Sequence, residues 1–193
     1  MSDFVEEAPG VIGFHLYEAV ECNSIVAVLR RNAGWHEATL REQRHEGSFE
    51  SRLQPELRSG RVLALDLAPE LDCDFARRMS ATVRPLVARV WGVDLPEHRG
   101  TQAVHYGAGE GYRAHFDAGL DLEDRYFTVL CYLNDDFEGG HTGFPGLGYT
   151  AAPCRGKAIL FPSRYFHSAE PVVAGEKLVI VSWITGPVPI RWI

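Results

Sequence analysis

The sequence contains no long hydrophobic run and no export signal. None of its apolar stretches approaches the roughly 20 residues that a membrane-spanning helix needs. The N-terminus, Met1-Ser-Asp-Phe-Val-Glu-Glu, is acidic and does not have the basic-then-apolar pattern of a signal peptide. We therefore expect a protein without a membrane span and with a cytoplasmic location.

The sequence also has no dense basic run. Its formal net charge is −7, and the most basic stretch, Arg41 to Arg44, is interrupted by Glu42 and Gln43. A surface that grips nucleic acid needs clustered lysines and arginines, because they displace counterions from the phosphates. We therefore expect no nucleic-acid partner.

Cysteine pairs, internal repeats and low-complexity tracts are likewise missing. The four cysteines, Cys22, Cys73, Cys131 and Cys154, form no C-x-x-C motif, which argues against a zinc ribbon. Without an export signal, reduced thiols are the default. A chain of 193 residues suits one large domain, so residues 1–193 are expected to form a single domain.

The first hundred residues carry helical and strand-like patterns but no motif of known function. The expected helices and strands are Glu21–Arg31 (helix), Trp35–Leu40 (strand), Val62–Leu67 (strand) and 72–92 (helix). The last helix has apolar residues at steps of three and four, and Pro85 is expected to kink or split it. We expect this part of the chain to support a core formed by residues 101–193.

After residue 100 the pattern changes to short apolar runs separated by turns rich in glycine and proline. The expected strands are Gln102–Tyr106, Tyr126–Leu133, Lys157–Phe161 and Leu178–Ile184. The last strand is apolar on both faces, which indicates burial on both faces. The sequence therefore predicts a mainly β fold with flanking α-helices, and a sandwich or jelly roll in the second half.

Three polar residues in this half could bind a metal. His115 and Asp117 lie two positions apart, so in a strand they would project to the same side, with Phe116 on the other. His167 follows the strand-like run 157–161. Two histidines and one carboxylate are the ligands of the facial triad of non-haem iron(II) enzymes. Each residue taken alone is equally compatible with an ordinary core or surface position.

Lys177 opens the last apolar strand and is a candidate for binding an anion. Alternation places it on the face that carries Val179, Val181 and Trp183. A lysine facing a core is rare unless it is paired, and an anionic co-substrate would pair it. The alternative is that Gly175-Glu176-Lys177 is a hairpin turn with a solvated lysine.

A series of short motifs connects these candidates. In chain order they are Tyr106-Gly-Ala-Gly-Glu-Gly-Tyr112, His115-Phe-Asp117, Arg125-Tyr-Phe-Thr-Val-Leu-Cys-Tyr-Leu-Asn134, Gly139-Gly-His-Thr-Gly-Phe-Pro145, Pro153-Cys-Arg-Gly-Lys-Ala-Ile-Leu-Phe161, His167, Pro171-Val-Val-Ala-Gly-Glu-Lys177 and Trp183. Together they resemble the prolyl 4-hydroxylase branch of the iron(II)- and 2-oxoglutarate-dependent oxygenase family. The resemblance covers less than half of the chain.

The resemblance implies a fold and a set of site residues. The expected fold is a double-stranded β-helix, a form of jelly roll. His115, Asp117 and His167 match the iron ligands, and Lys177 matches the lysine that binds the far carboxylate of 2-oxoglutarate. The residues that match further 2-oxoglutarate contacts are Tyr106 and Thr142, and those that match the substrate side are Tyr112, Arg125 and Trp183.

The resemblance also implies a reaction. Iron(II), 2-oxoglutarate and oxygen are the expected cofactor and co-substrates, and ascorbate is a further cofactor that the family allows. The expected reaction hydroxylates an unactivated carbon, most favourably of a prolyl residue in a peptide or protein or of free proline, and decarboxylates 2-oxoglutarate to succinate. Asp117 favours hydroxylation over halogenation, because halogenating relatives replace this carboxylate with a small residue.

Three alternatives stay open from the sequence. They are an oxygenase acting on another amino acid or small metabolite, a non-catalytic jelly-roll binding module, and an oxygen-sensing hydroxylase. His141 departs from the family pattern, because an acidic residue is common at that place in the Gly-Gly-x-Thr motif. The substrate, the oligomeric state and the role of the first hundred residues are not determined by the sequence.

Overall fold

A large antiparallel sheet forms the centre of the molecule. The computed structural model describes residues 4–45, 48–119 and 122–187. In spatial order the strands of the large sheet are β1 (Phe4–Ala8), β2 (Val11–His15), β13 (Lys157–Pro162), β9 (Arg125–Tyr132), β16 (Lys177–Thr185), β7 (Glu97–Tyr106), β6 (Arg61–Ala64) and β3 (His36–Glu37). The order combines strands from both halves of the chain, and long-range pairing therefore holds the sheet together.

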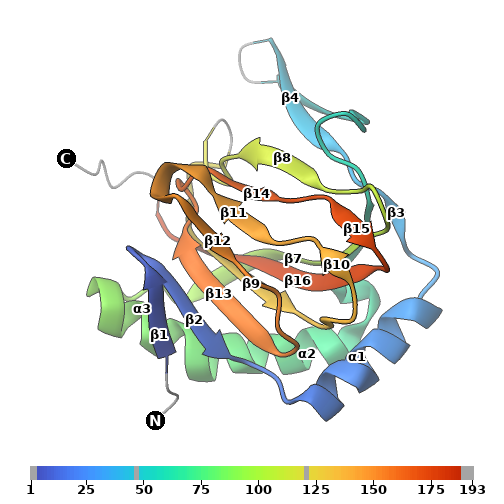
Figure 1. The fold of residues 1–193 in the computed structure, drawn as a ribbon. Coiled ribbons are helices and arrows are strands. Elements are labelled where there is room, and N and C mark those ends of the chain that lie inside the picture. The colour runs from blue at the N-terminus through green and yellow to red at the C-terminus, as the bar shows by residue number, and fades with distance from the viewer. Residues whose placement is uncertain (1–3, 46–47, 120–121, 188–193) are drawn as a thin grey trace.

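A smaller sheet faces the large one (Figure 1). Its strands, in spatial order, are β12 (Tyr149–Ala151), β11 (Thr142–Phe144), β14 (His167–Ala169) and β8 (Tyr112–His115). A two-stranded pair, β10 (Glu138–Gly139) and β15 (Val172–Ala174), extends the same layer. Phe144 and Ala151 of the smaller sheet share one buried cluster with Tyr132 and Val179 of the large sheet. These two sheets form the jelly-roll core that the sequence predicts.

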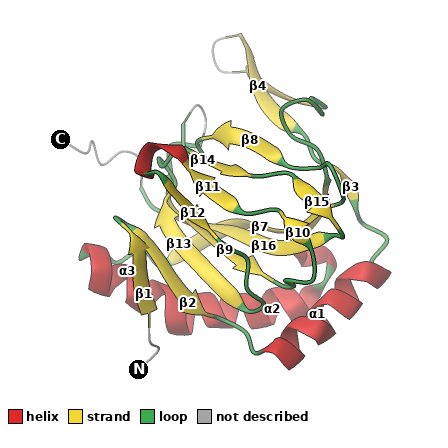
Figure 2. Ribbon diagram, in the orientation of Figure 1, coloured by secondary structure: helices red, strands yellow, loops and turns green. Residues whose placement is uncertain are grey.

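Helices cover the opposite face of the large sheet (Figure 2). They are α1 (Ala19–Arg31), α2 (Pro69–Arg78), a π-helical segment (Met79–Val83) and α3 (Arg84–Trp91), with short 3₁₀ turns at Leu65–Leu67 and Pro145–Leu147. Phe75 and Val83 from these helices pack with Leu178 and Ile180 of β16 in a second buried cluster. The molecule therefore has two cores, one between helices and sheet and one between the sheets.

The sequence explains where these helices begin and end. At the start of α1 the Glu18 backbone N–H donates to the Glu21 carboxylate, within a reciprocal capping box. Pro85 cannot donate a backbone hydrogen bond, and just before it the Arg84 N–H bonds the Met79 carbonyl five residues back. Gly92 ends α3 with a φ of 70°. The expected helix 72–92 is thus a helical run over 69–91 that is interrupted by a π segment.

Two strand predictions in the first half are partly wrong. Only His36–Glu37 of the expected strand Trp35–Leu40 pairs in the large sheet. The expected strand Val62–Leu67 ends at Ala64, and Leu65–Leu67 form a 3₁₀ turn. Val62, Leu63 and Leu65 are buried, whereas Leu67 at the end of the 3₁₀ turn is 53% exposed.

A hairpin, β4 (Leu40–His45) with β5 (Ser48–Arg52), projects from the body beside β8 (Figure 1). The chain after it is attached to β8 by backbone contacts: Arg58 bridges Tyr112, and the Arg113 N–H donates to the Leu57 carbonyl at 2.8 Å. The first half of the chain therefore reaches the rim of the jelly roll.

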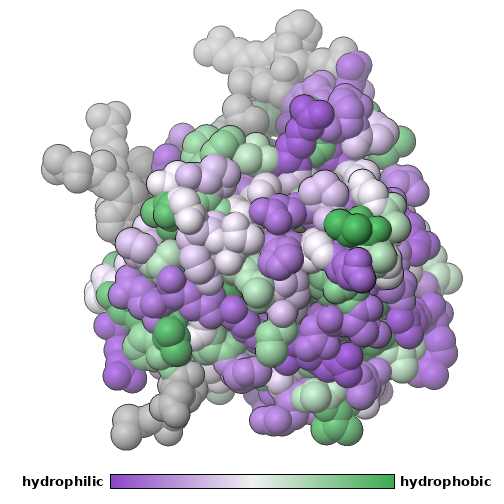
Figure 3. Space-filling model, in the orientation of Figure 1, coloured by the Kyte–Doolittle hydropathy of each residue, from purple (hydrophilic) through white to green (hydrophobic). Residues whose placement is uncertain are grey.

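The face seen in Figure 3 is hydrophilic over most of its area, with hydrophobic residues scattered among the polar ones. Within the part of the chain that the structure describes, no helix is long and apolar enough to cross a membrane. The single-domain assignment to residues 1–193 stays a prediction, and residues 1–3 and 188–193 at its ends lie outside the described residues.

Candidate active site

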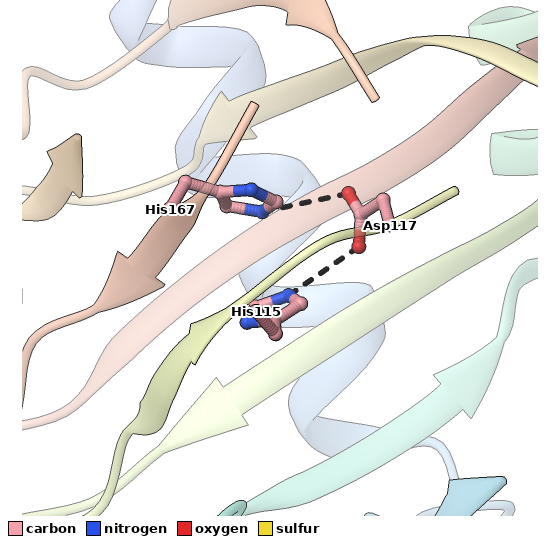
Figure 4. Close-up of side chains that lie close together, drawn as sticks. All are labelled: His115, Asp117 and His167. Atoms are coloured by element: carbon pink, nitrogen blue, oxygen red, sulfur yellow. Dashed lines mark ion pairs between the residues drawn. The ribbon is translucent and has the colours of Figure 1, made fainter. Parts of the chain in front are cut away.

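Strand pairing places the two candidate histidines side by side. His115 at the end of β8 is the register partner of His167 at the start of β14. Asp117 follows after the end of β8, because that strand ends at His115, so the two side chains do not lie in one strand. One potential ligand atom from each of these residues lies within 4.8 Å of the others. Figure 4 shows both imidazoles pointing toward the carboxylate, and we refer to the three residues as the His–Asp–His triad.

Backbone hydrogen bonds fix the proton positions on both imidazoles. Nδ1 of His115 lies 2.8 Å from the Arg113 carbonyl, and Nδ1 of His167 lies 2.9 Å from the Tyr165 carbonyl. A carbonyl only accepts, so each Nδ1 carries the proton, and the Nε2 of a neutral ring presents a lone pair. These Nε2 atoms lie 3.4 Å and 3.5 Å from the two carboxylate oxygens of Asp117. Two lone pairs and a carboxylate therefore face one another.

The surroundings keep Asp117 ionised and His167 neutral. Burial would raise the pKa of Asp117, but His167, His115 and the Thr128 hydrogen bond together hold it well below its usual value. Burial lowers the pKa of His167, which favours the neutral ring. An ionised carboxylate and neutral imidazoles are the protonation states that metal ligands require.

This donor set fits a divalent cation. Without a cation, converging lone pairs and a carboxylate in a buried site repel one another, and a metal ion removes that repulsion. Two imidazole nitrogens and one carboxylate are the protein ligands of non-haem iron(II) centres with open coordination positions. The residues present therefore match the iron site that the motifs imply.

Lys177 is completely buried at the start of β16, so the alternative of a solvated turn residue is wrong. Its Nζ donates to the Gly140 carbonyl at 2.6 Å and lies 5.3 Å and 5.5 Å from the ring centroids of Tyr106 and Tyr132. Burial lowers the pKa of Lys177 to about 7, and Glu170 opposes that shift. A buried ammonium with one backbone acceptor keeps two donors for an anion.

Gly140 makes this position of Lys177 possible. It adopts a φ of 63°, and a β-carbon there would lie 2.8 Å from the Phe137 ring and 3.2 Å from Lys177 Cδ. The second glycine of the Gly-Gly-x-Thr motif is therefore required for both the turn and the space beside the lysine.

The two other expected 2-oxoglutarate contacts lie next to Lys177. Tyr106 is the register partner of Lys177 across β7 and β16, and Thr142 is buried on β11. The Thr142 hydroxyl lies 2.6 Å from the hydroxyl of Tyr132, a residue that we did not predict. Tyr106 and Thr142 line one cavity with His115, Asp117 and His167, so the structure brings them together with the triad.

The three expected substrate-side residues line the same cavity. The Tyr112 ring stacks on His115, with ring centroids 3.4 Å apart. The Arg125 guanidinium lies 3.6 Å from the Trp183 ring centroid and donates from Nη1 to the Asp117 carbonyl at 3.3 Å. The cavity has a volume of about 580 Å³. His141, by contrast, does not line it and lies 3.8 Å from the Glu170 carboxylate.

Some residues at the site were not predicted from the sequence. Arg58 lines the cavity from the first half of the chain, where no motif marks it. Thr128 donates to Asp117 Oδ2 at 2.7 Å, and Ser163 lies 2.9 Å from the Thr128 hydroxyl. Thr128 is part of an apolar run that reads as a plain core strand. The alternation of β9 toward the cavity was the only signal that could have identified it.

Comparison with protein families and curated sequences gives the same picture. Residues 101–185 match the model of the 2OG-Fe(II) oxygenase superfamily. The chain is 32% identical over 132 residues to prolyl 4-hydroxylase subunit alpha-1 of Gallus gallus, covering 55% of this chain and 26% of that protein. It is 29% identical over 176 residues to probable prolyl 4-hydroxylase 7 of Arabidopsis thaliana, covering 72% of this chain and 55% of that one. The chain thus spans between about a quarter and about half of the length of these relatives.

Solved structures share the fold. A prolyl-4-hydroxylase of Pseudomonas putida superposes with a TM-score of 0.68 at 18% identity, covering 92% of this chain and 93% of that one. A prolyl hydroxylase of Trichoplax adhaerens was solved in complex with a peptide fragment of the hypoxia inducible factor oxygen degradation domain. It superposes with a TM-score of 0.68 at 19% identity, covering 91% of this chain and 83% of that one. The motifs, the fold and these matches together support a 2OG-Fe(II) oxygenase domain over residues 101–185, and prolyl 4-hydroxylases are among the proteins that the chain is similar to.

Proposed function

We propose that this chain is an iron(II)- and 2-oxoglutarate-dependent dioxygenase that hydroxylates a prolyl residue of a peptide or protein, or free proline. The observation that carries the proposal is a His–Asp–His triad at a cavity whose wall includes Tyr106, together with the fully buried Lys177, whose Nζ lies 5.3 Å from the Tyr106 ring centroid. A triad alone is compatible with many metals and reactions. A 2-oxoglutarate oxygenase needs ligands for iron and a cation for the far carboxylate of 2-oxoglutarate. The triad and the buried lysine would supply these two parts.

In this site His115, Asp117 and His167 would hold the iron. Bound iron(II) supplies the activation of oxygen that couples decarboxylation of 2-oxoglutarate to hydroxylation of the substrate. The protein keeps both imidazoles in the correct tautomer through the Arg113 and Tyr165 carbonyls. The ligands are thus oriented before the metal arrives.

Lys177 would bind the far carboxylate of 2-oxoglutarate by charge-assisted hydrogen bonds. Its Nζ already has the Gly140 carbonyl as one acceptor, which fixes the direction of the remaining donors. Tyr106 and Thr142 are placed to add hydroxyl contacts from the cavity wall. The apolar residues Val104 and Leu130 line the same cavity and exclude water from the bound groups.

Tyr112 and Trp183 would contact the substrate on the open side of the triad. Flat aromatic walls suit a pyrrolidine ring or an extended proline-containing peptide. The relatives named above support a prolyl substrate. An oxygenase acting on another amino acid or metabolite is the second candidate, and the cavity volume of about 580 Å³ is in the usual range for small-molecule sites.

Two further hypotheses carry less support. A non-catalytic module would not bind iron or 2-oxoglutarate. The buried lysine and the mutually repulsive triad residues would then only lower its stability. An oxygen-sensing role would require a protein partner. The cytoplasmic location also stays a prediction.

Succinate formation tests the proposal directly. The purified protein is loaded with iron(II) without oxygen and then given oxygen, 2-oxoglutarate and proline-containing peptides or free L-proline. We expect iron-dependent succinate and a product heavier by one oxygen atom in mass spectrometry. If correctly folded, iron-loaded protein forms no succinate with any of these compounds or without them, the proposed function is wrong.

A further inference from the structure

Lys177 lies where the pairing of β7 with β16 ends. It is the first residue of β16, and its register partner Tyr106 is the last residue of β7. On the other side of β16, strand β9 ends at Tyr132, which is the register partner of Val179. The end of a strand has fewer neighbours than its middle and opens more readily. The position of Lys177 therefore depends on what holds this strand end.

Asn134 holds this strand end through its side-chain amide. Its Nδ2 donates to the Glu176 carbonyl at 2.8 Å, and its Oδ1 accepts from the Leu178 N–H at 2.8 Å. One side chain therefore binds the backbone on both sides of Lys177. The Leu133 N–H donates to the Leu178 carbonyl at 2.9 Å, so the amide continues the hydrogen bonds between the two strands beyond the end of β9.

The amide of Asn134 is buried, and its hydrogen bonds fix its orientation. Asn134 is 5% exposed, and Nδ2 also donates to Asp136 Oδ1 at 2.8 Å. This hydrogen bond is the largest cause of the lowered pKa of the Asp136 carboxyl. Only Oδ1 can accept from a backbone N–H, and only Nδ2 can donate to a carbonyl. Both Nδ2 hydrogens are therefore used, and the amide cannot turn over without losing these partners.

A second link joins the same strand ends on the opposite face of the sheet. His105 precedes Tyr106 and Glu176 precedes Lys177, and His105 Nε2 lies 2.9 Å from Glu176 Oε2. Arg30 at the end of α1 forms an ion pair with the other oxygen of Glu176. Burial opposes ionisation of Glu176, but the hydrogen bonds from His105 and Arg30 lower its pKa. The side chain of Glu176 is thus held from β7 and α1, and its carbonyl is held by the Asn134 amide.

We propose that Asn134 is a positioning residue for 2-oxoglutarate, which acts through the backbone of Lys177. This inference rests on the proposed function, because it concerns the co-substrate site of the same reaction. From the backbone that Asn134 holds, Lys177 Nζ reaches the Gly140 carbonyl at 2.6 Å. A shift of that backbone moves the ammonium, and a displacement of about 1 Å is enough to weaken a site built on exact distances.

Asn134→Leu tests the inference, because leucine has nearly the shape of asparagine but forms no side-chain hydrogen bond. Binding of 2-oxoglutarate is measured by calorimetry on protein loaded with Mn(II) without oxygen, so that no turnover occurs. We expect the dissociation constant to rise by about 5- to 50-fold, as the loss of one or two buried hydrogen bonds implies. The affinity for Mn(II) should change little, because His115 and His167 lie on β8 and β14 of the other sheet.

Asn32→Leu is the matched control. The amide of Asn32 also bridges two backbone groups, since it donates to the Leu67 carbonyl and accepts from the Gly34 N–H, both at 2.8 Å. Both variants lose a bridge of the same kind, and both should have lower thermal stability. Only Asn134→Leu should weaken the binding of 2-oxoglutarate.

NMR of protein labelled at the lysine ε-carbon reports on Lys177 without any co-substrate. The chain has two lysines, Lys157 and Lys177. Asn134→Leu should shift the Lys177 signal and leave that of Lys157 unchanged, whereas Asn32→Leu should shift neither. If Asn134→Leu does not fold, Asn134→Ser takes its place, because the single oxygen of serine cannot replace both Oδ1 and Nδ2. It should change the same two readouts in the same direction.

Unchanged 2-oxoglutarate affinity in the folded Asn134 variant overturns the inference. An equal loss in Asn32→Leu, or an equal loss of Mn(II) affinity in the Asn134 variant, also overturns it, because the role of Asn134 would then be general stability. Succinate formation by the iron-loaded wild-type protein is measured in parallel. Succinate together with unchanged affinity in the variant refutes only the inference, and 2-oxoglutarate binding without succinate refutes only the proposed reaction. If the wild-type protein does not bind 2-oxoglutarate, both are wrong.

Discussion

The Thr128 hydroxyl donates a hydrogen bond of 2.7 Å to Asp117 Oδ2. An ionised carboxylate only accepts, so Thr128 must give its one proton to Asp117, and the Ser163 hydroxyl at 2.9 Å must donate to Thr128. The Asp117 and Ala118 backbone N–H groups also donate to the Ser163 carbonyl, at 3.0 Å and 3.1 Å. A buried chain of donors therefore orients the carboxylate of the triad.

We predict that Thr128→Val weakens metal binding by about 10- to 100-fold, the usual effect of removing a hydrogen bond to a ligating side chain. Titration with Mn(II) or Co(II) measures the change, and Thr128→Ser should restore most of the affinity. Thr101→Val is a matched control, since Thr101 and Ser182 form a similar hydroxyl pair at 2.9 Å outside the cavity lining. Wild-type affinity in Thr128→Val would show that this hydrogen bond is only structural.

His115→Ala and His167→Ala should each abolish turnover and greatly reduce metal content, because each removes one of three protein ligands. Metal content is measured by elemental analysis of the purified variants, and circular dichroism checks that they fold. His36→Ala, at an exposed position on β3, is the control. Full metal content together with full activity in either variant would disprove the assignment. Zinc, nickel or cobalt in the purified protein would be compatible with it, since raw affinity does not select iron.

Lys177→Ala should raise the apparent KM for 2-oxoglutarate strongly and affect metal binding little. Removing one partner of a buried charge pair costs roughly 2–5 kcal/mol. The other lysine of the chain provides the control: Lys157 forms an ion pair with Glu7 at 2.7 Å. Unchanged 2-oxoglutarate kinetics in Lys177→Ala would remove this residue from the co-substrate site.

Binding of 2-oxoglutarate should weaken as the pH rises above neutrality. Burial lowers the pKa of Lys177 to about 7, so above that pH the free protein must take up a proton before the ammonium can bind the anion. Calorimetry should show proton uptake at pH 8 and an affinity that falls by up to about tenfold per pH unit. Affinity that is independent of pH between 6.5 and 9 would contradict the low pKa.

The lowered pKa of Lys177 should also make the stability of the free protein depend on pH. The unfolded chain keeps the ordinary lysine pKa of 10.5, so between about 7 and 10.5 the unfolded state binds more protons than the folded state. The contribution of Lys177 to the free energy of unfolding therefore increases with pH across this window and is lost as the pH falls toward 7. Because the chain has two lysines, Lys157 and Lys177, NMR of lysine-labelled protein can follow each directly. A Lys177 signal that titrates near 10.5 would refute this prediction.

The sequence by itself determined the second half of the fold and the chemistry of its site. The alternation along the predicted strand Leu178–Ile184 defined both faces of β16, because a strand buried on both sides has to be apolar on both. The spacing of His115 and Asp117 indicated a shared direction, and the ordered motifs linked them to His167 and Lys177. Strand alternation and residue spacing are local patterns, and the motifs occur in the order typical of the family. A single sequence is therefore enough to predict them.

The tertiary structure alone decided which other residues complete the site. Arg58 reaches the cavity because the chain after the β4–β5 hairpin bridges β8, and no pattern near Arg58 encodes that contact. Thr128 and Ser163 meet Asp117 because β9 pairs with β13 and the chain after β13 turns beneath the triad. The depressed pKa of Lys177 likewise depends on burial by residues far away in the sequence. Long-range packing sets such contacts, and a linear pattern does not record which distant residues will pack together.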